Sequence, residues 1–282
     1  MDVLITGATG LIGQHLVPAL RAAHEVWAVA RRERPADVRA DVHWITTDVA
    51  TPRFISDLPP RADVVVHLAQ SAHYRDFPEH ALDVFEVNVA STARLLDWSL
   101  AAGVRQFILA SSGGIAAATA LSHYLASKRS AELLAQSYAS KLRVLVLRFF
   151  FVYGRGQKPW MLVPRLAESI RTHRSVALAG ANGPRLNPVH VGDAVRAIVT
   201  AIDRQADGCI DIAGPESLTV RDMCEAIAAQ YGCRPQFAPD SAAESIDLLG
   251  DVGPMSARLV APERRFSDAI AETIAAGEGR LR

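Results

Sequence analysis

A glycine-rich turn near the start of the chain restricts the fold more than any other feature of the sequence. Residues 3–5 form a short apolar run, Thr-Gly-Ala-Thr-Gly-Leu-Ile-Gly occupies residues 6–13, and apolar residues at helical spacing continue to residue 23. A strand that passes through such glycines into a helix is typical of phosphate-binding turns, because the glycines bring backbone amides close to a pyrophosphate. An ordinary strand-to-helix turn is the alternative. The residues expected to contact a dinucleotide here are Gly7, Thr9, Gly10, Leu11, Ile12 and Gly13.

Short apolar runs alternate with longer helical segments, and this alternation predicts the fold class. The expected strands cover residues 3–5, 25–30, 42–46, 64–68, 107–110 and 142–147. Continuous apolar strands separated by helices are typical of a parallel sheet that is covered on both faces. We therefore expect an α/β fold with a doubly wound Rossmann parallel sheet.

The rhythm changes after residue 150, where several glycines and Pro159 interrupt it. We expect a dinucleotide-binding domain over residues 1–150, to which a helix within residues 187–206 returns. Residues 151–186 and 207–282 are expected to form a smaller, interleaved C-terminal lobe that binds the substrate. Within that lobe, Thr219 is a candidate N-cap for a helix that runs to residue 231.

Composition argues against several functional classes. Lys+Arg and Asp+Glu both number 30, so the formal net charge is zero, which argues against a nucleic-acid-binding surface. No apolar stretch approaches the roughly 18 residues that a membrane helix needs. The three cysteines lack the paired short spacing of disulfide frameworks or zinc sites. We therefore expect a cytoplasmic protein with a small-molecule substrate, no nucleic-acid or membrane partner, and no metal site.

The tip of the second expected strand bears on which dinucleotide is bound. A carboxylate at this position favours NAD through the adenosine ribose, whereas arginine accommodates the extra phosphate of NADP. The strand ends at Ala30, and Arg31 and Arg32 follow it with no acid at the tip. Two guanidinium groups suit a phosphate, so we expect NADP, with NAD as the alternative.

Tyr124 and Lys128 provide the candidate acid–base chemistry. Their spacing places a phenol and an ammonium one helical turn apart on the same face. A free phenol has a pKa of about 10, and a nearby ammonium stabilises the phenolate. Upstream, an expected strand ends in Ser111 and Ser112, where ligands bind in open α/β sheets. Ser112 is the preferred candidate to hydrogen-bond a substrate oxygen, although spacing alone does not separate it from Ser111.

These residues and further motifs make the chain similar to the extended short-chain dehydrogenases/reductases of the NAD(P)-dependent epimerase/dehydratase family. The resemblance covers nearly the whole chain, and the motifs occur in the family's order. The further motifs are Asp48-Val49, His67-Leu68-Ala69-Gln70, Val87-Asn88-Val89, Asn187-Pro188-Val189-His190-Val191-Gly192-Asp193 and Gly214-Pro215-Glu216.

The resemblance implies roles for the individual residues. Tyr124 would be the acid/base, Lys128 would lower its pKa and hold the nicotinamide ribose, and Ser112 would bind the reacting oxygen. Asp48 and Val49 would contact the adenine. The full set of further cofactor contacts is Asp48, Val49, Leu68, Ala69, Gln70, Asn88, Ser111 and Phe151.

Departures from the family pattern bear on the substrate. Only eleven residues separate Ser112 from Tyr124, where many members carry a longer loop, so a more open pocket is expected. Phe151 stands where the family usually has an asparagine that contacts the diphosphate of a nucleotide-sugar. The acidic set of the sugar 4,6-dehydratases is also absent after Ser112, which argues against that activity. His73 and Arg185 are expected substrate contacts, with solvated surface positions as the alternative for both.

The expected function is hydride transfer by an NAD(P)-dependent oxidoreductase to or from a sugar or nucleotide-sugar-derived carbonyl. An NAD-dependent sugar epimerase that acts through a transient ketone is the alternative enzyme. A non-catalytic dinucleotide sensor is the alternative from another class, and it has no need of Tyr124 and Lys128. The resemblance also implies a homodimer whose four-helix interface includes the helix of Tyr124.

Overall fold

A computed structural model describes residues 1–117, 120–242 and 245–278. The chain folds into two compact units. The first comprises Met1–Arg148 and Val195–Ile210, and the second comprises Phe149–Ala194 and Asp211–Arg282. Helix α7 (Val191–Asp203) carries the chain back into the first unit, so the boundary falls inside this helix, which lies within the range 187–206 expected for the return.

A seven-stranded sheet in the order β3-β2-β1-β4-β5-β6-β9 forms the centre of the first unit. The strands are β1 (Asp2–Thr6), β2 (Glu25–Ala30), β3 (His43–Thr46), β4 (Val64–His67), β5 (Gln106–Ser112), β6 (Arg143–Phe149) and β9 (Gly208–Ile212). β1 pairs in parallel with β2 on one side and β4 on the other. The strand order therefore reverses between β1 and β4, which is where ligands bind in open α/β sheets. The expected doubly wound α/β fold is confirmed.

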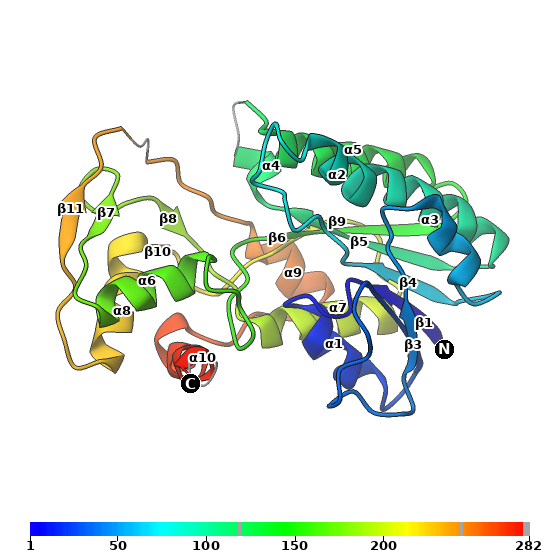
Figure 1. Cartoon of the computed structure of the whole chain (residues 1–282), viewed down its shortest axis with the longest axis horizontal. Helices are drawn as coiled ribbons and strands as arrows, with labels where there is room; N and C mark the ends of the chain where they lie inside the picture. The colour runs from blue at the N-terminus through cyan, green and yellow to red at the C-terminus, as the bar shows by residue number, and fades with distance from the viewer. Residues whose placement is uncertain (118–119, 243–244, 279–282) are drawn as a thin grey trace. The chain divides into compact units, whose positions relative to one another are not determined.

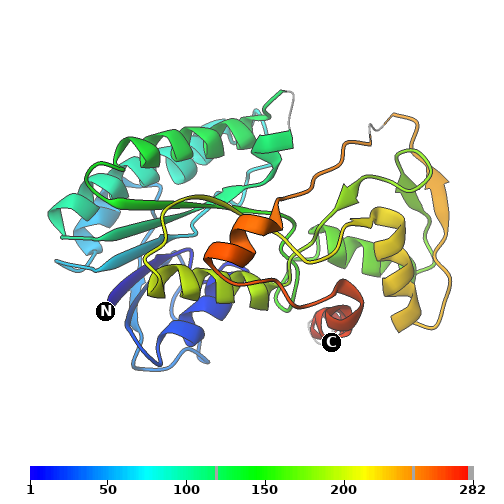
Figure 2. The same cartoon turned by 180° about the vertical axis from the view of Figure 1, so that it is seen from behind.

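Helices lie on both faces of this sheet. Helices α3 and α5 cover one face, and α1 and α7 cover the other (Figures 1 and 2). Besides α7, the helical elements of this unit are α1 (Gly13–Leu20), η1 (Pro52–Asp57), α2 (Ala81–Phe85), the π-helical turn η2 (Glu86–Ala90), α3 (Ser91–Ala101), α4 (Gly114–Ala117) and α5 (His123–Ser137). Covering on both faces explains why β4 reads Val-Val-Val and is buried throughout. Among the described helices, none has the length and apolar character needed to cross a membrane.

The core of the first unit positions helix α5, which carries Tyr124 and Lys128. Ala131 and Ala135 of α5 share one apolar core with Phe107 of β5, and their small side chains let the helix lie close to the sheet. The helix begins one residue before Tyr124, because the side chain of Ser122 accepts a hydrogen bond from the Leu125 amide at 3.3 Å.

The second unit has its own core between short strands and helices. Its strands are β7 (Val176–Leu178), β8 (Arg185–Leu186), β10 (Leu218–Thr219) and β11 (Phe237–Pro239), and its helices are α6 (Leu162–Arg171), α8 (Val220–Gln230), α9 (Val252–Arg258) and α10 (Phe266–Glu278). β10 pairs with β8 and β11 pairs with β7. Thr219 is the N-cap of α8, as expected, and it forms a capping box with Asp222. The four short strands were not expected from the sequence, because runs of two or three residues carry no detectable period.

Candidate active site

The glycine turn forms a cradle between β1 and α1 that side chains would fill. Gly7 has a φ of +71°, and a Cβ there would lie 2.8 Å from the Ala69 amide nitrogen. A Cβ on Gly13 would lie 2.4 Å from the Gly7 carbonyl oxygen. The backbones of the turn, of the first residues of α1 and of the end of β4 therefore pack directly against one another. This close packing, with a helix N-terminus beside the turn, fits the pyrophosphate of a dinucleotide. Thr9, Leu11 and Ile12 are half-buried and Gly10 is exposed in the same turn.

The expected cofactor contacts of the first unit gather at one edge of the sheet, apart from Asn88 and Lys128, which lie on helical segments. They are the glycine turn after β1, Arg31 and Arg32 after β2, Asp48 and Val49 after β3, Leu68, Ala69 and Gln70 after β4, and Ser111 in β5, next to Ser112. β1 to β5 are parallel, so their carboxyl ends meet at the same edge. The reversal of strand order between β1 and β4 lies within this set.

The residues after β2 and β3 differ in exposure. Arg31 and Arg32 are both exposed, while the Trp44 indole donates a hydrogen bond to the Arg32 carbonyl at 3.0 Å and holds the backbone of this tip. The Asp48 carboxylate accepts from the Ala50 amide at 3.0 Å within its own turn. Asp48 therefore shapes the turn in which the family resemblance implies an adenine contact, and Val49 beside it is buried.

Asn88 connects the loop after β4 to helix α5. Its Oδ1 accepts from the Ser71 amide at 3.0 Å, and its Nδ2 donates to Ser127 Oγ at 2.9 Å. Ser127 Oγ in turn donates to the Tyr124 carbonyl at 2.7 Å. Asn88 is buried in the π-helical turn η2, a type of turn that is frequent at functional sites. Both ends of its amide bind protein groups, so Asn88 positions the first turn of α5.

The Tyr124 hydroxyl is held between side chains at the carboxyl edge of the sheet. It donates to Gln70 Oε1 at 3.1 Å. Burial raises the pKa of Tyr124 to about 12, although a hydrogen bond with Ser112 and the charge of Arg75 act in the opposite direction. The Tyr74 ring lies 5.0 Å from the Tyr124 ring, and the Arg75 guanidinium lies 5.1 Å from the Tyr74 ring. Tyr124 is therefore a protonated phenol at neutral pH.

Lys128 lies one helical turn after Tyr124 and is 5% exposed. Its Nζ donates to the Ala110 carbonyl at 3.0 Å. Burial lowers the pKa of Lys128 to about 8, because a low-dielectric environment disfavours the charged form. The family resemblance implies that Lys128 lowers the pKa of Tyr124, and this role stays a prediction. The structure shows that Ser112 and Arg75 act to lower that pKa and that the Lys128 ammonium hydrogen-bonds the backbone of β5.

A buried carboxylate lies one further turn along α5. Glu132 is 0% exposed, and Arg148 donates to its two oxygens at 2.8 Å each. Ser111 Oγ donates to Glu132 at 2.7 Å and Arg129 at 3.0 Å. Burial alone would raise the pKa of Glu132, but these hydrogen bonds outweigh burial and hold the pKa below its usual value. The network joins α5 to β5 and β6, and no signal in the sequence predicted it although Glu132 lies four residues after Lys128.

His67 is a neutral imidazole at the end of β4. Its Nδ1 lies 2.6 Å from Thr6 Oγ1, and its Nε2 lies 3.1 Å from Thr92 Oγ1. Burial, with a smaller effect from the charge of Lys128, lowers the pKa of His67 to about 3. Thr6 Oγ1 also accepts from the Ala69 amide at 3.2 Å. The imidazole therefore ties the strand before the glycine turn to β4 and α3.

His73, an expected substrate contact, lies in the loop between β4 and α2. Its Nδ1 is 3.0 Å from Asp76 Oδ2, and its ring stacks on the His80 ring with centroids 4.0 Å apart. Its amide donates to Ser71 Oγ at 3.0 Å. The ring of His73 therefore has neighbours from the same loop on one edge and on one face.

Phe151 and Arg185, the other expected contacts, belong to the second unit. Phe151 has a φ of +44°, a conformation that asparagine adopts more readily than phenylalanine. The backbone there thus has a shape that suits the asparagine usual in the family. Arg185 donates from Nε to Asp247 Oδ2 at 2.8 Å and from its amide to Asp247 Oδ1 at 2.8 Å, so it has a role within the second unit.

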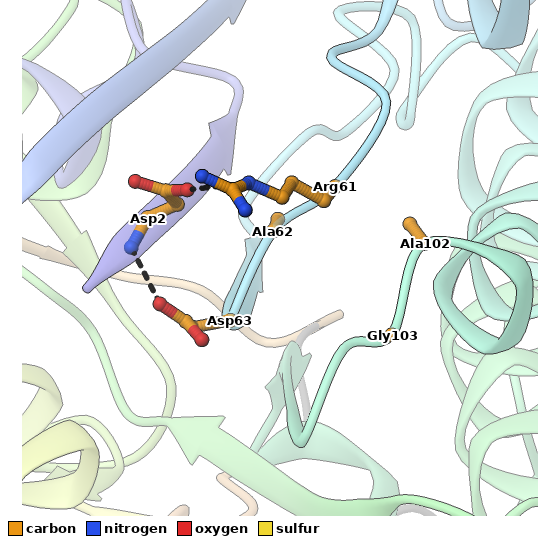
Figure 3. A pocket seen from close by; sticks show the side chains of 6 residues that line it. All are labelled: Asp2, Arg61, Ala62, Asp63, Ala102 and Gly103. Carbon is orange, nitrogen blue, oxygen red and sulfur yellow. Dashed lines mark hydrogen bonds and ion pairs between the residues drawn. The ribbon is translucent and has the colours of Figure 1, made fainter.

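A hollow at the amino ends of β1 and β4 lies at the opposite edge of the sheet (Figure 3). It is lined by Asp2, Arg61, Ala62, Asp63, Ala102 and Gly103. The Asp2 amide donates to Asp63 Oδ2 at 2.8 Å and lowers the pKa of Asp63, and Arg61 lies 3.7 Å from the Asp2 carboxylate. These polar groups pair with one another, far from the edge that carries Tyr124. The hollow is therefore distinct from the candidate active site.

Comparisons with known proteins show which family and which fold this chain resembles. The model of the NAD dependent epimerase/dehydratase family matches residues 3–213. The dTDP-D-glucose 4,6-dehydratase of Mus musculus is 24% identical over 73% of this chain and 66% of its own length. The ceramide reductase of Caulobacter vibrioides is 30% identical over 83% of this chain and 72% of its own length. A solved structure, MoeE5 in complex with UDP-glucuronic acid and NAD, is 29% identical, has a TM-score of 0.85 and covers 100% of both chains.

The family match begins in β1 and ends just after β9. It therefore includes the glycine turn, the strand ends that surround it, Tyr124 and Lys128. The expectations of an enzyme and of a nicotinamide dinucleotide as its cofactor are confirmed at this level. The chain belongs to the NAD-dependent epimerase/dehydratase family of extended short-chain dehydrogenases/reductases.

Proposed function

We propose that this enzyme catalyses reversible hydride transfer at a carbonyl or carbinol carbon, with carbonyl reduction as its main direction. The observation that carries the proposal is the Tyr124 phenol, which hydrogen-bonds Gln70 and Ser112 at the carboxyl edge of the sheet. Its pKa of about 12 keeps it protonated at neutral pH. A protonated phenol is the form that donates a proton to a ketone oxygen as that oxygen gains negative charge.

Tyr124 and the side chains around it have different roles in the proposed reaction. When bound, the nicotinamide ring supplies hydride to the carbonyl carbon or accepts it from the carbinol carbon. The Ser112 hydroxyl donates a hydrogen bond to the substrate oxygen, and Tyr124 transfers its proton to the same oxygen. Lys128, with a pKa of about 8, is mostly protonated at pH 7 and stabilises the resulting phenolate. In the oxidative direction, the phenolate of Tyr124 accepts the proton of the substrate hydroxyl.

We propose a sugar or nucleotide-sugar-derived ketone as the substrate class. Two similar proteins support it by name, since one is a dTDP-D-glucose 4,6-dehydratase and the other is solved with UDP-glucuronic acid. The similar ceramide reductase is named for a lipid. Phe151, in place of the usual asparagine, supports a ketone that is recognised without that diphosphate contact.

An assay with a panel of ketones tests the proposal. Each reaction contains the protein, NADPH and one ketone, which is a keto-sugar, a nucleotide-linked keto-sugar or a long-chain keto lipid. The absorbance of the nicotinamide is followed, and the products are analysed. Cofactor oxidation with turnover on a sugar ketone supports the proposal. In a separate arm with NAD⁺ and a nucleotide-sugar, inversion of the sugar without net change in the cofactor would instead identify an epimerase. Turnover on the lipid alone would contradict the substrate class, and binding without chemistry on any arm would contradict the reaction.

We further propose that NADP(H) is the preferred dinucleotide. The support is the exposed pair Arg31 and Arg32 at the tip of β2. Replacing both with alanine is expected to weaken NADPH binding about 10- to 100-fold, because two charge-assisted hydrogen bonds to the ribose phosphate are lost, and to leave NADH binding within about twofold. Fluorescence titration measures both affinities. Arg34→Ala, an exposed arginine of the same segment, is the control, and an equal loss for both dinucleotides would contradict the preference.

We also propose that the enzyme works as a cytoplasmic homodimer that pairs through α2 and α5. Leu82 of α2 is 80% exposed, Phe85 of α2 is 47% exposed and Leu133 of α5 is 53% exposed, and exposed apolar side chains on neighbouring helices favour an interface. Cys209, Cys224 and Cys233 form no disulfide within the described part of the chain, and the rarity of disulfides in reducing compartments supports this location. Sedimentation velocity on Leu133→Glu is expected to show a shift from dimer to monomer. A variant that sediments as the wild type does would argue against this interface.

A further inference from the structure

The loop between β4 and α2 brings together three metal-ligating side chains that the sequence spacing did not single out. His73, Asp76 and His80 each offer one ligand atom, and these atoms all lie within 4.8 Å of one another. A tetrahedral ion that is bound at about 2.0–2.1 Å by nitrogen and oxygen needs its ligands about 3.3 Å apart. His73 Nδ1 and Asp76 Oδ2 are already 3.0 Å apart. Side-chain rotations that bring the ligand atoms from within 4.8 Å to about 3.3 Å of one another would therefore complete the set.

The backbone of the loop arranges these side chains in successive turns. The Asp76 amide donates to the His73 carbonyl at 2.9 Å, and the His80 amide donates to the Asp76 carbonyl at 2.8 Å. The two imidazole rings stack face to face, with centroids 4.0 Å apart and planes at 14°, so at least one ring must turn before a nitrogen of each ring points at the same ion. The carboxylate of Asp76 lies at the Nδ1 edge of His73. The same loop geometry that stacks the rings therefore gathers three different ligands.

The chemistry and exposure of the cluster favour a particular class of ion. Two imidazoles and one carboxylate are a ligand set that suits Zn²⁺ and its neighbours Co²⁺ and Ni²⁺, rather than Mg²⁺ or Ca²⁺, which prefer oxygen. The side chains of His73 and Asp76 are 43% and 53% exposed. Water can therefore reach the cluster and fill a fourth coordination position.

We propose that His73, Asp76 and His80 form a binding site for a divalent ion of the zinc class. The site would cross-link the two ends of the 73–80 segment. That segment contains Tyr74, whose ring lies 5.0 Å from the Tyr124 ring. Its start is anchored by Ser71, whose amide donates to the buried Asn88. The bound ion thus stiffens the part of the loop that packs against the catalytic tyrosine.

The test measures metal binding directly, on the full chain without an affinity tag. Zn²⁺ is titrated by calorimetry, and Co²⁺ is used as a spectroscopic probe of the ligands. The expected result is one ion per chain, a Co²⁺ spectrum without a thiolate charge-transfer band, and a higher Tm with Zn²⁺. His80→Asn and Asp76→Asn are each expected to weaken Zn²⁺ binding by at least about tenfold. Loss of a residue that only hydrogen-bonds a metal ligand already lowers metal affinity by about that factor, and loss of a ligand itself lowers it no less.

Two control variants keep the result interpretable. His173→Asn removes an exposed histidine of the second unit, whose φ of +54° asparagine also tolerates, and Cys209→Ser removes an exposed thiol. Both are expected to bind Zn²⁺ as the wild type does. Circular dichroism checks that His80→Asn remains folded, as expected for an exposed side chain. Absence of saturable Zn²⁺ binding, wild-type affinity in His80→Asn or Asp76→Asn, or loss of binding in Cys209→Ser would each overturn the proposal.

Discussion

Tyr124→Phe is expected to lower kcat about 10²- to 10⁴-fold, the usual contribution of a positioned acid–base group. Phenylalanine keeps the ring and its packing against Tyr74, so only the hydroxyl that Gln70 and Ser112 hold is lost. Dinucleotide affinity is expected to stay within about twofold, because the glycine turn belongs to a different part of the sheet edge. Steady-state kinetics on the best ketone of the panel and a separate NADPH titration measure the two quantities.

Tyr138→Phe is the matched control for this substitution. Tyr138 is the C-cap of the same helix and packs, half-buried, on the core of the first unit. The control is expected to keep wild-type kcat and KM, because its hydroxyl lies four turns of helix beyond Tyr124. Turnover of Tyr124→Phe within about tenfold of the wild type would remove the phenol from the mechanism and with it the basis of the proposed reaction.

Glu132→Gln is expected to destabilise the protein by about 3 kcal/mol, the lower end of the range for breaking a buried ion pair. The neutral amide leaves the buried end of Arg148 without its counter-charge and has one acceptor where the carboxylate has two. The lower end applies because the Arg148 side chain keeps 19% exposure and some access to water. Urea unfolding followed by circular dichroism measures the change in the free energy of unfolding.

A surface pair on another helix is the control for this prediction. Glu168 and Arg171 are 2.8 Å apart but 41% and 44% exposed, so Glu168→Gln is expected to cost less than about 1 kcal/mol. If Glu132→Gln and Glu168→Gln lowered the free energy of unfolding equally, burial would not be the reason that the Glu132 network stabilises the protein.

The same network predicts a pH dependence with a definite sign. The pKa of Glu132 is lower in the folded state than in the unfolded state, so its stabilisation is complete above the unfolded value of about 4.3. It is lost as the pH falls through the folded-state pKa. The stability difference between wild type and Glu132→Gln is therefore expected to narrow below pH 4.3, in the same unfolding experiment.

Much of the fold and part of the candidate site were predictable, because the relevant signals are local. The glycines of residues 7–13 and the apolar runs that follow identified the doubly wound sheet, and four-residue spacing placed Tyr124 and Lys128 on one helical face. The two small sheets of the second unit were not predicted, because strands as short as β8 and β10, with two residues each, show no hydrophobic period. The spacing did not reveal that the Lys128 ammonium also hydrogen-bonds the Ala110 carbonyl, because that contact joins the helix to a strand 18 residues earlier in the chain.

The sequence by itself determined the backbone conformation of the turn, the order along the chain of the first six strands of the central sheet, and the chemical types at the sheet edge. These follow from glycine geometry and hydrophobic period, which act between residues close in the chain. Tertiary structure alone decided which distant side chains meet, as Glu132 meets Arg148 and Asn88 meets Ser127. Such meetings depend on how helices pack on the sheet, and that packing also decides how far each group is buried and how its proton affinity shifts.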